Sequence, residues 1–241
     1  MSRPPKKPTR SRPPRRQASG RPRLLQGDCI EVLASLKPAS VDAIVTDPPY
    51  GIGFRKEHWD TPTTDGLTPG KAFEAFTQAW AGECLRALKP GGYLIAFAAA
   101  RMVHRLASGI EDAGFELRDQ LLWLYGSGVP KTPLVNGRSS TLKPAYEPIV
   151  LARKPLKGTH SANEQQWGTG RLGVNDTRIP TIASAQGRWP CNIALSHNSS
   201  CKPSMCGRGC AVQILDRAVP GVRPSRFFYC AKPSRREREQ G

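Results

Sequence analysis

A short strand signal near the start of the chain runs directly into an acidic, proline-rich turn. Residues 41–45 read as a buried strand, and Asp47-Pro48-Pro49-Tyr50 follows almost at once. Two consecutive prolines lack N–H donors and have a fixed φ, so a ladder of strand hydrogen bonds cannot continue through them. The strand must therefore stop here, with Asp47 at its carboxyl end.

Strand and helix signals alternate on both sides of this turn. Apolar residues recur every three or four positions over 71–88, which predicts a helix that ends at Pro90-Gly91-Gly92. A short helix is expected after Asp28, where a first strand ends, and another over 101–113. Further strands are expected at 93–98, 115–124 and 149–152. This alternation predicts an α/β sheet, in which ligands bind beyond the carboxyl ends of the strands. Asp28 and Asp47 should both lie at that edge.

The charge of the chain indicates a polyanionic partner. Its 241 residues include 36 Lys and Arg against 19 Asp and Glu, a net charge of +17. Residues 1–23 hold nine of these basic residues, six prolines and no acid, which predicts a disordered basic arm. Residues 231–241 are expected to form a second disordered basic tail. Such an excess of cations favours binding to nucleic acid phosphates.

Two features bear on the location of the protein. No apolar run is long enough to span a bilayer, so no membrane partner is expected. The seven cysteines are an odd number and no export signal precedes them, which predicts a reduced, cytoplasmic protein of a bacterial or phage-infected cell.

The tetrapeptide suits the methylation of an amine. The exocyclic amine of adenine is a poor nucleophile because its lone pair is delocalised into the ring. If the Asp47 carboxylate and the Pro48 carbonyl accept its N–H bonds, the lone pair can turn toward a methyl donor. Pro48 and Pro49 present rigid carbonyl acceptors, and Tyr50 offers a ring on which a flipped base can stack.

The surrounding sequence resembles the DNA amino-methyltransferase family that acts on adenine N6 or cytosine N4. The resemblance is carried by the runs LLQGDCIEVLASLKPASVDAIVTDPPYGIGF, LKPGGYLIAFAAARM and KPAYEPIVLARKP. It implies a Rossmann-like methyltransferase domain over 24–155 that uses S-adenosylmethionine to methylate double-stranded DNA by base flipping, as in restriction-modification. It also implies that Asp47, Pro48, Pro49 and Tyr50 are catalytic, and that Asp28 and Asp47 bind the cofactor. The leading Asp47 favours adenine N6, and the alternatives are cytosine N4 or an inactive DNA-binding remnant.

One part of the family pattern is not found. The order of motifs resembles the permuted class, whose glycine-rich cofactor loop comes last, but the chain reads FFYCAKPSRREREQG at that point. The sheet is therefore expected to be partial, and either a second polypeptide completes the cofactor site or the chain is inactive. The run from Gly168 to Gly173 matches G-x-G-x-x-G, but it lacks the strand and helix that the motif needs. We interpret it as a loop of a target-recognition insert over 156–230.

The insert holds a cluster of metal-ligand types. His197, Cys201, Cys206 and Cys210 lie within fourteen residues of a polar, glycine-rich stretch, and could fold around one structural Zn²⁺. The alternative is a set of surface thiols. Trp167, Trp189, Phe227, Phe228 and Tyr229 either contact DNA or form a small core of the insert, with core favoured for Phe227 and Phe228. Phe54 either flanks the base pocket or is core, and Lys143, Tyr146 and Glu147 have no assigned role.

Overall fold

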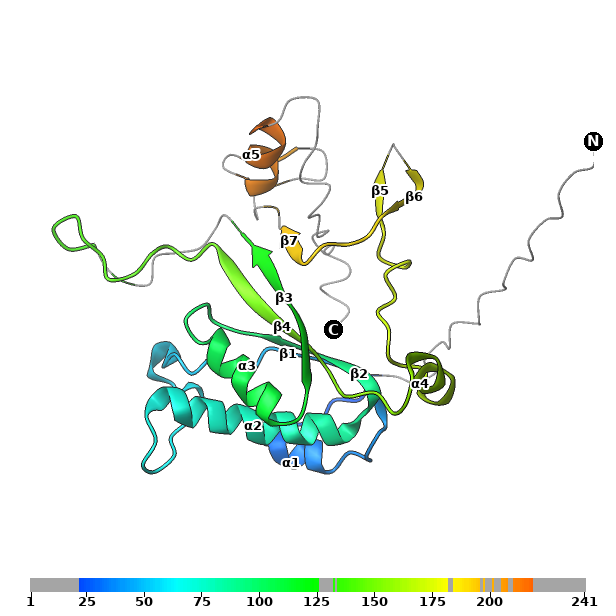
Figure 1. Ribbon diagram of the computed structural model, residues 1–241. Coiled ribbons are helices and arrows are strands. Elements are labelled where there is room, and N and C mark those ends of the chain that lie inside the picture. The colour runs from blue at the N-terminus through cyan, green and yellow to red at the C-terminus, as the bar shows by residue number, and fades with distance from the viewer. Residues whose placement is uncertain are drawn as a thin grey trace, which may run out of the picture.

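The computed structural model describes residues 22–125, 132, 134–181, 184–195, 197, 201, 205–207 and 210–218. Figure 1 shows the ribbon. The basic arm before Pro22, the C-terminal tail and Phe227, Phe228 and Tyr229 lie outside these residues, so the expectations for them stay predictions.

The elements alternate between helix and strand through the first two thirds of the chain. They run in the order α1 (Cys29–Ala34), β1 (Val41–Thr46), the 3-10 turns η1 (Phe54–Lys56) and η2 (His58–Asp60), α2 (Pro69–Ala87), β2 (Leu88–Phe97), α3 (Val103–Asp112), β3 (Glu116–Leu124) and β4 (Tyr146–Arg153). Beyond them come α4 (His160–Trp167), β5 (Ile179–Thr181), β6 (Ser184–Arg188), β7 (Ile193–Leu195) and α5 (Ala211–Ala218). The predicted α/β fold is confirmed.

The main sheet has the strand order β1-β2-β4-β3-β7. β1 and β2 are parallel, β4 is antiparallel to both of its neighbours, and β7 is parallel to β3. Strands β1, β2, β3 and β7 therefore run in the same direction and end at the same side of the sheet, here called the carboxyl edge. β5 and β6 form a separate hairpin.

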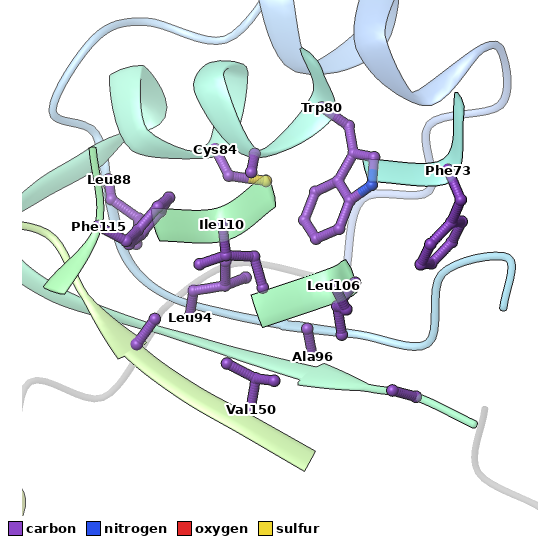
Figure 2. Close-up of a cluster of buried hydrophobic side chains, with 13 residues drawn as sticks. Phe73, Trp80, Cys84, Leu88, Leu94, Ala96, Leu106, Ile110, Phe115 and Val150 are labelled. Atoms are coloured by element: carbon purple, nitrogen blue, oxygen red, sulfur yellow. The ribbon is translucent and has the colours of Figure 1, made fainter. Parts of the chain in front are cut away.

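Helices α1, α2 and α3 lie on the same side of this sheet in Figure 1. Figure 2 shows the core between them, where Trp80 and Cys84 of α2 and Leu106 and Ile110 of α3 meet Leu94 of β2. These side chains are at most 4% exposed. Burial of one such side chain contributes roughly 1.5–3 kcal/mol to stability, so this layer fixes the positions of β1 and β2, whose ends form part of the carboxyl edge.

The first expected strand is not formed. Residues 22–28 have no strand conformation, and Leu24 is 94% exposed. A strand needs a hydrogen-bonded neighbour, and among the described residues none pairs with this segment. Asp28 therefore follows an irregular segment, although it does precede the expected short helix.

Helices α4 and α5 form where loops are expected. Thr159 caps α4 through a bond from the Ala162 N–H, and Gly168 ends it in the left-handed region at φ 75°. α4 has no apolar stripe, so periodicity could not reveal it. The fully buried Asn163 holds it in place, because its amide accepts from Lys157 and donates to the Pro90 and Thr169 carbonyls. No helix in the described part of the chain is long and apolar enough to cross a membrane.

Candidate active site

The tetrapeptide begins one residue after β1 ends at Thr46, so it lies at the carboxyl edge as predicted. The Asp47 side chain is exposed, whereas Pro48, Pro49 and Tyr50 are half-buried. An exposed carboxylate on rigid, partly buried backbone is available to a ligand without a large conformational change.

The electrostatic environment of Tyr50 includes Asp47, Glu147 of β4 and Tyr125, which follows β3. Burial raises the pKa of Tyr50 well above its usual value, and its hydrogen bond to the Asp47 carboxylate and the nearby charge of Glu147 add to the shift. Burial and Glu147 also raise the pKa of Tyr125. Tyr50 therefore stays protonated, and its hydroxyl can donate to Asp47. A carboxylate has about four lone-pair positions, so Asp47 can still accept N–H groups from a substrate.

A buried carboxylate braces the backbone that follows the tetrapeptide. Asp60 is 1% exposed and accepts hydrogen bonds from the backbone N–H groups of Tyr50, Gly51, Ile52 and Phe54, at N···O distances of 2.6, 2.8, 3.2 and 2.7 Å. The Gly53 N–H donates to the Asp60 carbonyl as well. Successive N–H groups that converge in this way form a concave anion site, and Asp60 fills it from within the chain.

Two glycines permit this loop to close. Gly51 and Gly53 have φ values of 65° and 66°, which L residues with a side chain rarely adopt. A Cβ at Gly51 would also lie 2.6 Å from the Phe73 ring of α2. From the far side, Arg101 donates through Nη2 to the Ile52 carbonyl at 2.9 Å. The loop from Tyr50 to Asp60 is thus fixed by contacts with both α2 and the segment after β2.

Asp28 has a local structural role. Its carboxylate caps α1, with bonds from the Ile30 and Glu31 N–H groups at 2.9 and 3.3 Å. The side chain is exposed, so one oxygen remains open to solvent or to a ligand. Its expected contact with a cofactor stays a prediction.

Two exposed aromatic rings lie on the same loop. Phe54 is 47% exposed and Trp59 58% exposed, with their ring centroids 6.3 Å apart, and the Arg55 guanidinium lies over the Phe54 ring at 5.2 Å. The alternative that Phe54 belongs to the core is therefore wrong. Exposed aromatic and basic side chains side by side suit contact with bases and phosphates.

Three other features singled out in the sequence can be compared with the structure. The run from Gly168 to Gly173 begins with the glycine that ends α4 and continues as a loop, and its place in a target-recognition insert stays a prediction. The four residues of the cysteine cluster do come together: their ligand atoms all lie within 4.8 Å of one another. Trp189 is 67% exposed, so it is not part of a core.

Sequence reasoning missed Asp60, Arg101 and Tyr125. Asp60 is one of several acids in a polar stretch, and nothing in its spacing marks it as buried. Arg101 and Tyr125 act through contacts with residues about fifty or more positions away. The one available signal was position, since Arg101 and Tyr125 each follow soon after a predicted strand.

The sequence matches the family model for N6/N4 DNA methylases over residues 41–190. It is 29% identical over 182 residues to the type II methyltransferase M.HpaI of Haemophilus parainfluenzae, covering 74% of this chain and 52% of that protein. It is 32% identical over 101 residues to YubD of Escherichia coli strain K12, which is named as a methylase, covering 42% of each chain.

A solved structure with a similar chain is TTHA0409 of Thermus thermophilus, described as a DNA modification methylase. The two are 25% identical over 63% of this chain and 60% of that one, with a TM-score of 0.39. The chain spans about half the length of the curated relatives it matches. Because the family match covers the greater part of the chain, including the strand and turn that carry Asp47, the protein belongs to the N6/N4 DNA methylase family.

Proposed function

We propose that the protein takes part in transferring a methyl group from S-adenosylmethionine to the exocyclic N6 amine of adenine in double-stranded DNA. The observation that carries this proposal is the exposed Asp47 carboxylate, held beside Tyr50 at the carboxyl edge by a loop that Asp60 braces. Family membership supports DNA as the substrate, and the net charge of +17 supports binding to its phosphates.

The proposed chemistry is mainly orientation. Asp47 and the Pro48 carbonyl accept the two N–H bonds of a flipped-out base, so the amine nitrogen turns its lone pair toward the methyl donor. The protonated Tyr50 hydroxyl keeps the Asp47 carboxylate in one orientation, while the Tyr50 ring offers a surface for stacking. Phe54 and Trp59 add exposed aromatic surface on the same loop.

The cofactor supplies the activated methyl group when it is bound. Among the described residues, the exposed carboxylates of Asp28 and Asp47 fit its cationic, hydroxyl-bearing chemistry, and these two residues would hold it. Asp28 keeps its cap on α1 in this role, because a carboxylate can accept from the helix and from a ligand at the same time.

The proposal includes a partner for β1. In the part of the chain that the structure describes, β1 is hydrogen-bonded to a neighbouring strand on one side only, and Val45 is 67% exposed. Further strands, in a continuation of this chain or in a second polypeptide, would pair with this edge and complete the cofactor pocket. Calorimetry with S-adenosylmethionine tests this: binding by the present chain alone at micromolar affinity would contradict the need for a partner.

The main experiment incubates duplex DNA with isotope-labelled S-adenosylmethionine and the protein, alone and with a cell extract of its source. Digestion to nucleosides and mass spectrometry then distinguish N6-methyladenine from N4-methylcytosine. Asp47→Ala should abolish transfer while leaving salt-dependent DNA binding unchanged. Asp65→Ala, at an exposed aspartate outside the site, is the matched control and should remain active.

Three results would overturn parts of the proposal. N4-methylcytosine as the product would keep the chemistry and refute the adenine assignment. DNA binding without transfer under any of these conditions would identify an inactive DNA-binding protein. Equal transfer by Asp47→Ala and the unmodified protein would refute the role of the tetrapeptide.

A further inference from the structure

Four possible metal ligands converge beside the last strand of the main sheet. The Nδ1 atom of His197 lies 3.5 Å from the Sγ of Cys206 and 3.5 Å from the Sγ of Cys210. Cys201 completes the group, since one ligand atom from each of the four lies within 4.8 Å of every other. Cys210 is fully buried and the other three are half-buried.

These distances match the edges of a tetrahedral zinc site. With Zn–S bonds of about 2.3 Å and Zn–N bonds of about 2.0–2.1 Å, ideal tetrahedral angles give S···N separations of about 3.5–3.6 Å and S···S separations of about 3.8 Å. Both S···N distances fall at this value, and the remaining pairs lie within reach of it after small side-chain rotations. Four protein ligands also leave no open position, as in structural rather than catalytic zinc sites.

The contacts around the His197 ring also suit metal ligation. Nδ1 of a neutral imidazole has one lone pair and can accept one S–H, yet two thiols lie at the same distance from it. The Gly207 N–H also donates to the Cys201 Sγ, at 3.2 Å. A backbone N–H directed at sulfur stabilises a thiolate more than a thiol, and it is a typical outer-shell partner of a metal ligand.

Among its described residues, the surrounding segment has only a small apolar core. Apart from Cys210, the buried apolar side chains described here are Leu195 and Val212, with Leu124 and Leu215 packed beside them. The described Met205, between two of the cysteines, is 63% exposed. Segments with so little core are commonly stabilised by a bound metal.

The position of the cluster connects it to the carboxyl edge. Leu195 ends β7 and pairs in register with Leu124, which ends β3 immediately before Tyr125. β7 and β3 are parallel, so His197 follows β7 at the same side of the sheet as Asp47 follows β1. A metal here would link the end of β7, through His197, to the start of α5, through Cys210.

We infer that His197, Cys201, Cys206 and Cys210 bind one structural Zn²⁺, which links these four residues to one another beside the end of β7. The inference is independent of the methylation chemistry, because it rests on the four ligands and their surroundings alone.

Metal analysis of the full chain, purified without chelators, tests this inference. We expect about one zinc ion per chain, and near zero in Cys206→Ser and Cys210→Ser. Replacement by Co²⁺ should produce the intense visible bands of a tetrahedral ion together with a thiolate charge-transfer band. Neither measurement requires DNA or S-adenosylmethionine, so failure here is distinguishable from failure of the proposed function.

Two further variants separate loss of a ligand from loss of folding. His197→Cys preserves four ligands and should retain zinc, with Co²⁺ bands shifted toward those of a four-sulfur site, whereas His197→Ala should lose it. Cys191→Ser, at an exposed cysteine outside the cluster, should retain zinc. A chain that contains no zinc and gives only an octahedral Co²⁺ spectrum would overturn the inference. So would full zinc content in Cys206→Ser, or iron and inorganic sulfide in place of zinc.

Discussion

Removal of the Asp60 carboxylate should open the loop that carries the end of the tetrapeptide. Four backbone N–H groups donate to it, and hydrogen bonds to a charged group contribute about 1.5–3 kcal/mol each. These bonds are only partly buried, so water can replace some of them in a variant. For Asp60→Ala we therefore expect a loss of roughly 3–6 kcal/mol, a large part of the usual stability of 5–15 kcal/mol for a domain.

Asp60→Asn is the sharper change because the side chain keeps its size. The amide retains one acceptor oxygen but directs an NH₂ group at the donors that the second oxygen served. About half of the interaction should be lost, roughly 2–4 kcal/mol. Urea unfolding at neutral pH measures this difference, and the exposed Trp59 next to Asp60 contributes to the fluorescence signal together with the other four tryptophans.

Limited trypsin digestion separates local opening from global unfolding. Arg55 and Lys56 lie in the braced loop, so cleavage after them should accelerate in Asp60→Asn more than cleavage in α2. Asp65→Asn, at an exposed site just beyond the loop, should change neither measurement. If Asp60→Asn unfolds within about 0.5 kcal/mol of the unmodified protein and the loop is cut no faster, other contacts hold the tetrapeptide and the role given to Asp60 is refuted.

Four other substitutions test the packing. Gly109→Ala should destabilise the fold by about 1–3 kcal/mol despite the better helix propensity of alanine, because its Cβ would lie 2.6 Å from the Glu74 carbonyl; Gly82→Ala, with no atom within 4 Å of its Cβ, should stabilise it by up to about 1 kcal/mol. Shifts of the urea midpoint in opposite directions for these two variants would confirm both predictions. Burial raises the pKa of Cys84 from 9.0 to about 12, so the stability it contributes is present below pH 9 and is lost as pH rises toward 12. Between pH 7 and about pH 10.5, under reducing conditions, the free energy of unfolding should therefore fall by about 2 kcal/mol less in Cys84→Ala than in the unmodified protein. Equal decreases would show that this thiol does not cause the pH dependence. Asn163→Ala should release α4 at a cost of about 2–4 kcal/mol, seen as faster amide hydrogen exchange there than in α2.

The elements with a strong apolar period could be predicted from the sequence. The helix expected at 71–88 is α2, Pro69–Ala87. Phe73, Trp80 and Cys84 of its apolar face are buried, because each three- or four-residue step returns to the same side of a helix, whereas Phe76 is half-buried. Its end is confirmed within one residue, although Pro90, expected to terminate the helix, lies within β2.

Elements without such a period depended on tertiary contacts. α4 has no apolar stripe and is held by the buried Asn163, whose carbonyl partners include Pro90, more than seventy residues earlier. The strand expected before Asp28 failed for the opposite reason. Its residues have strand character, but a strand forms only where a neighbour supplies hydrogen bonds, and no described residue does so.

The sequence alone determined the residue types of Asp47-Pro48-Pro49-Tyr50 and their place at the end of a strand, because two prolines must end a ladder and an acid there lies at the ligand-binding edge. Only the tertiary structure decided what surrounds it. Glu147 reaches Tyr50 because β4 is inserted between β2 and β3, and Asp60 braces the loop because Gly51 and Gly53 let the backbone N–H groups converge. Residue types are a local property of the chain, whereas burial and distance arise only when segments far apart in the sequence pack together.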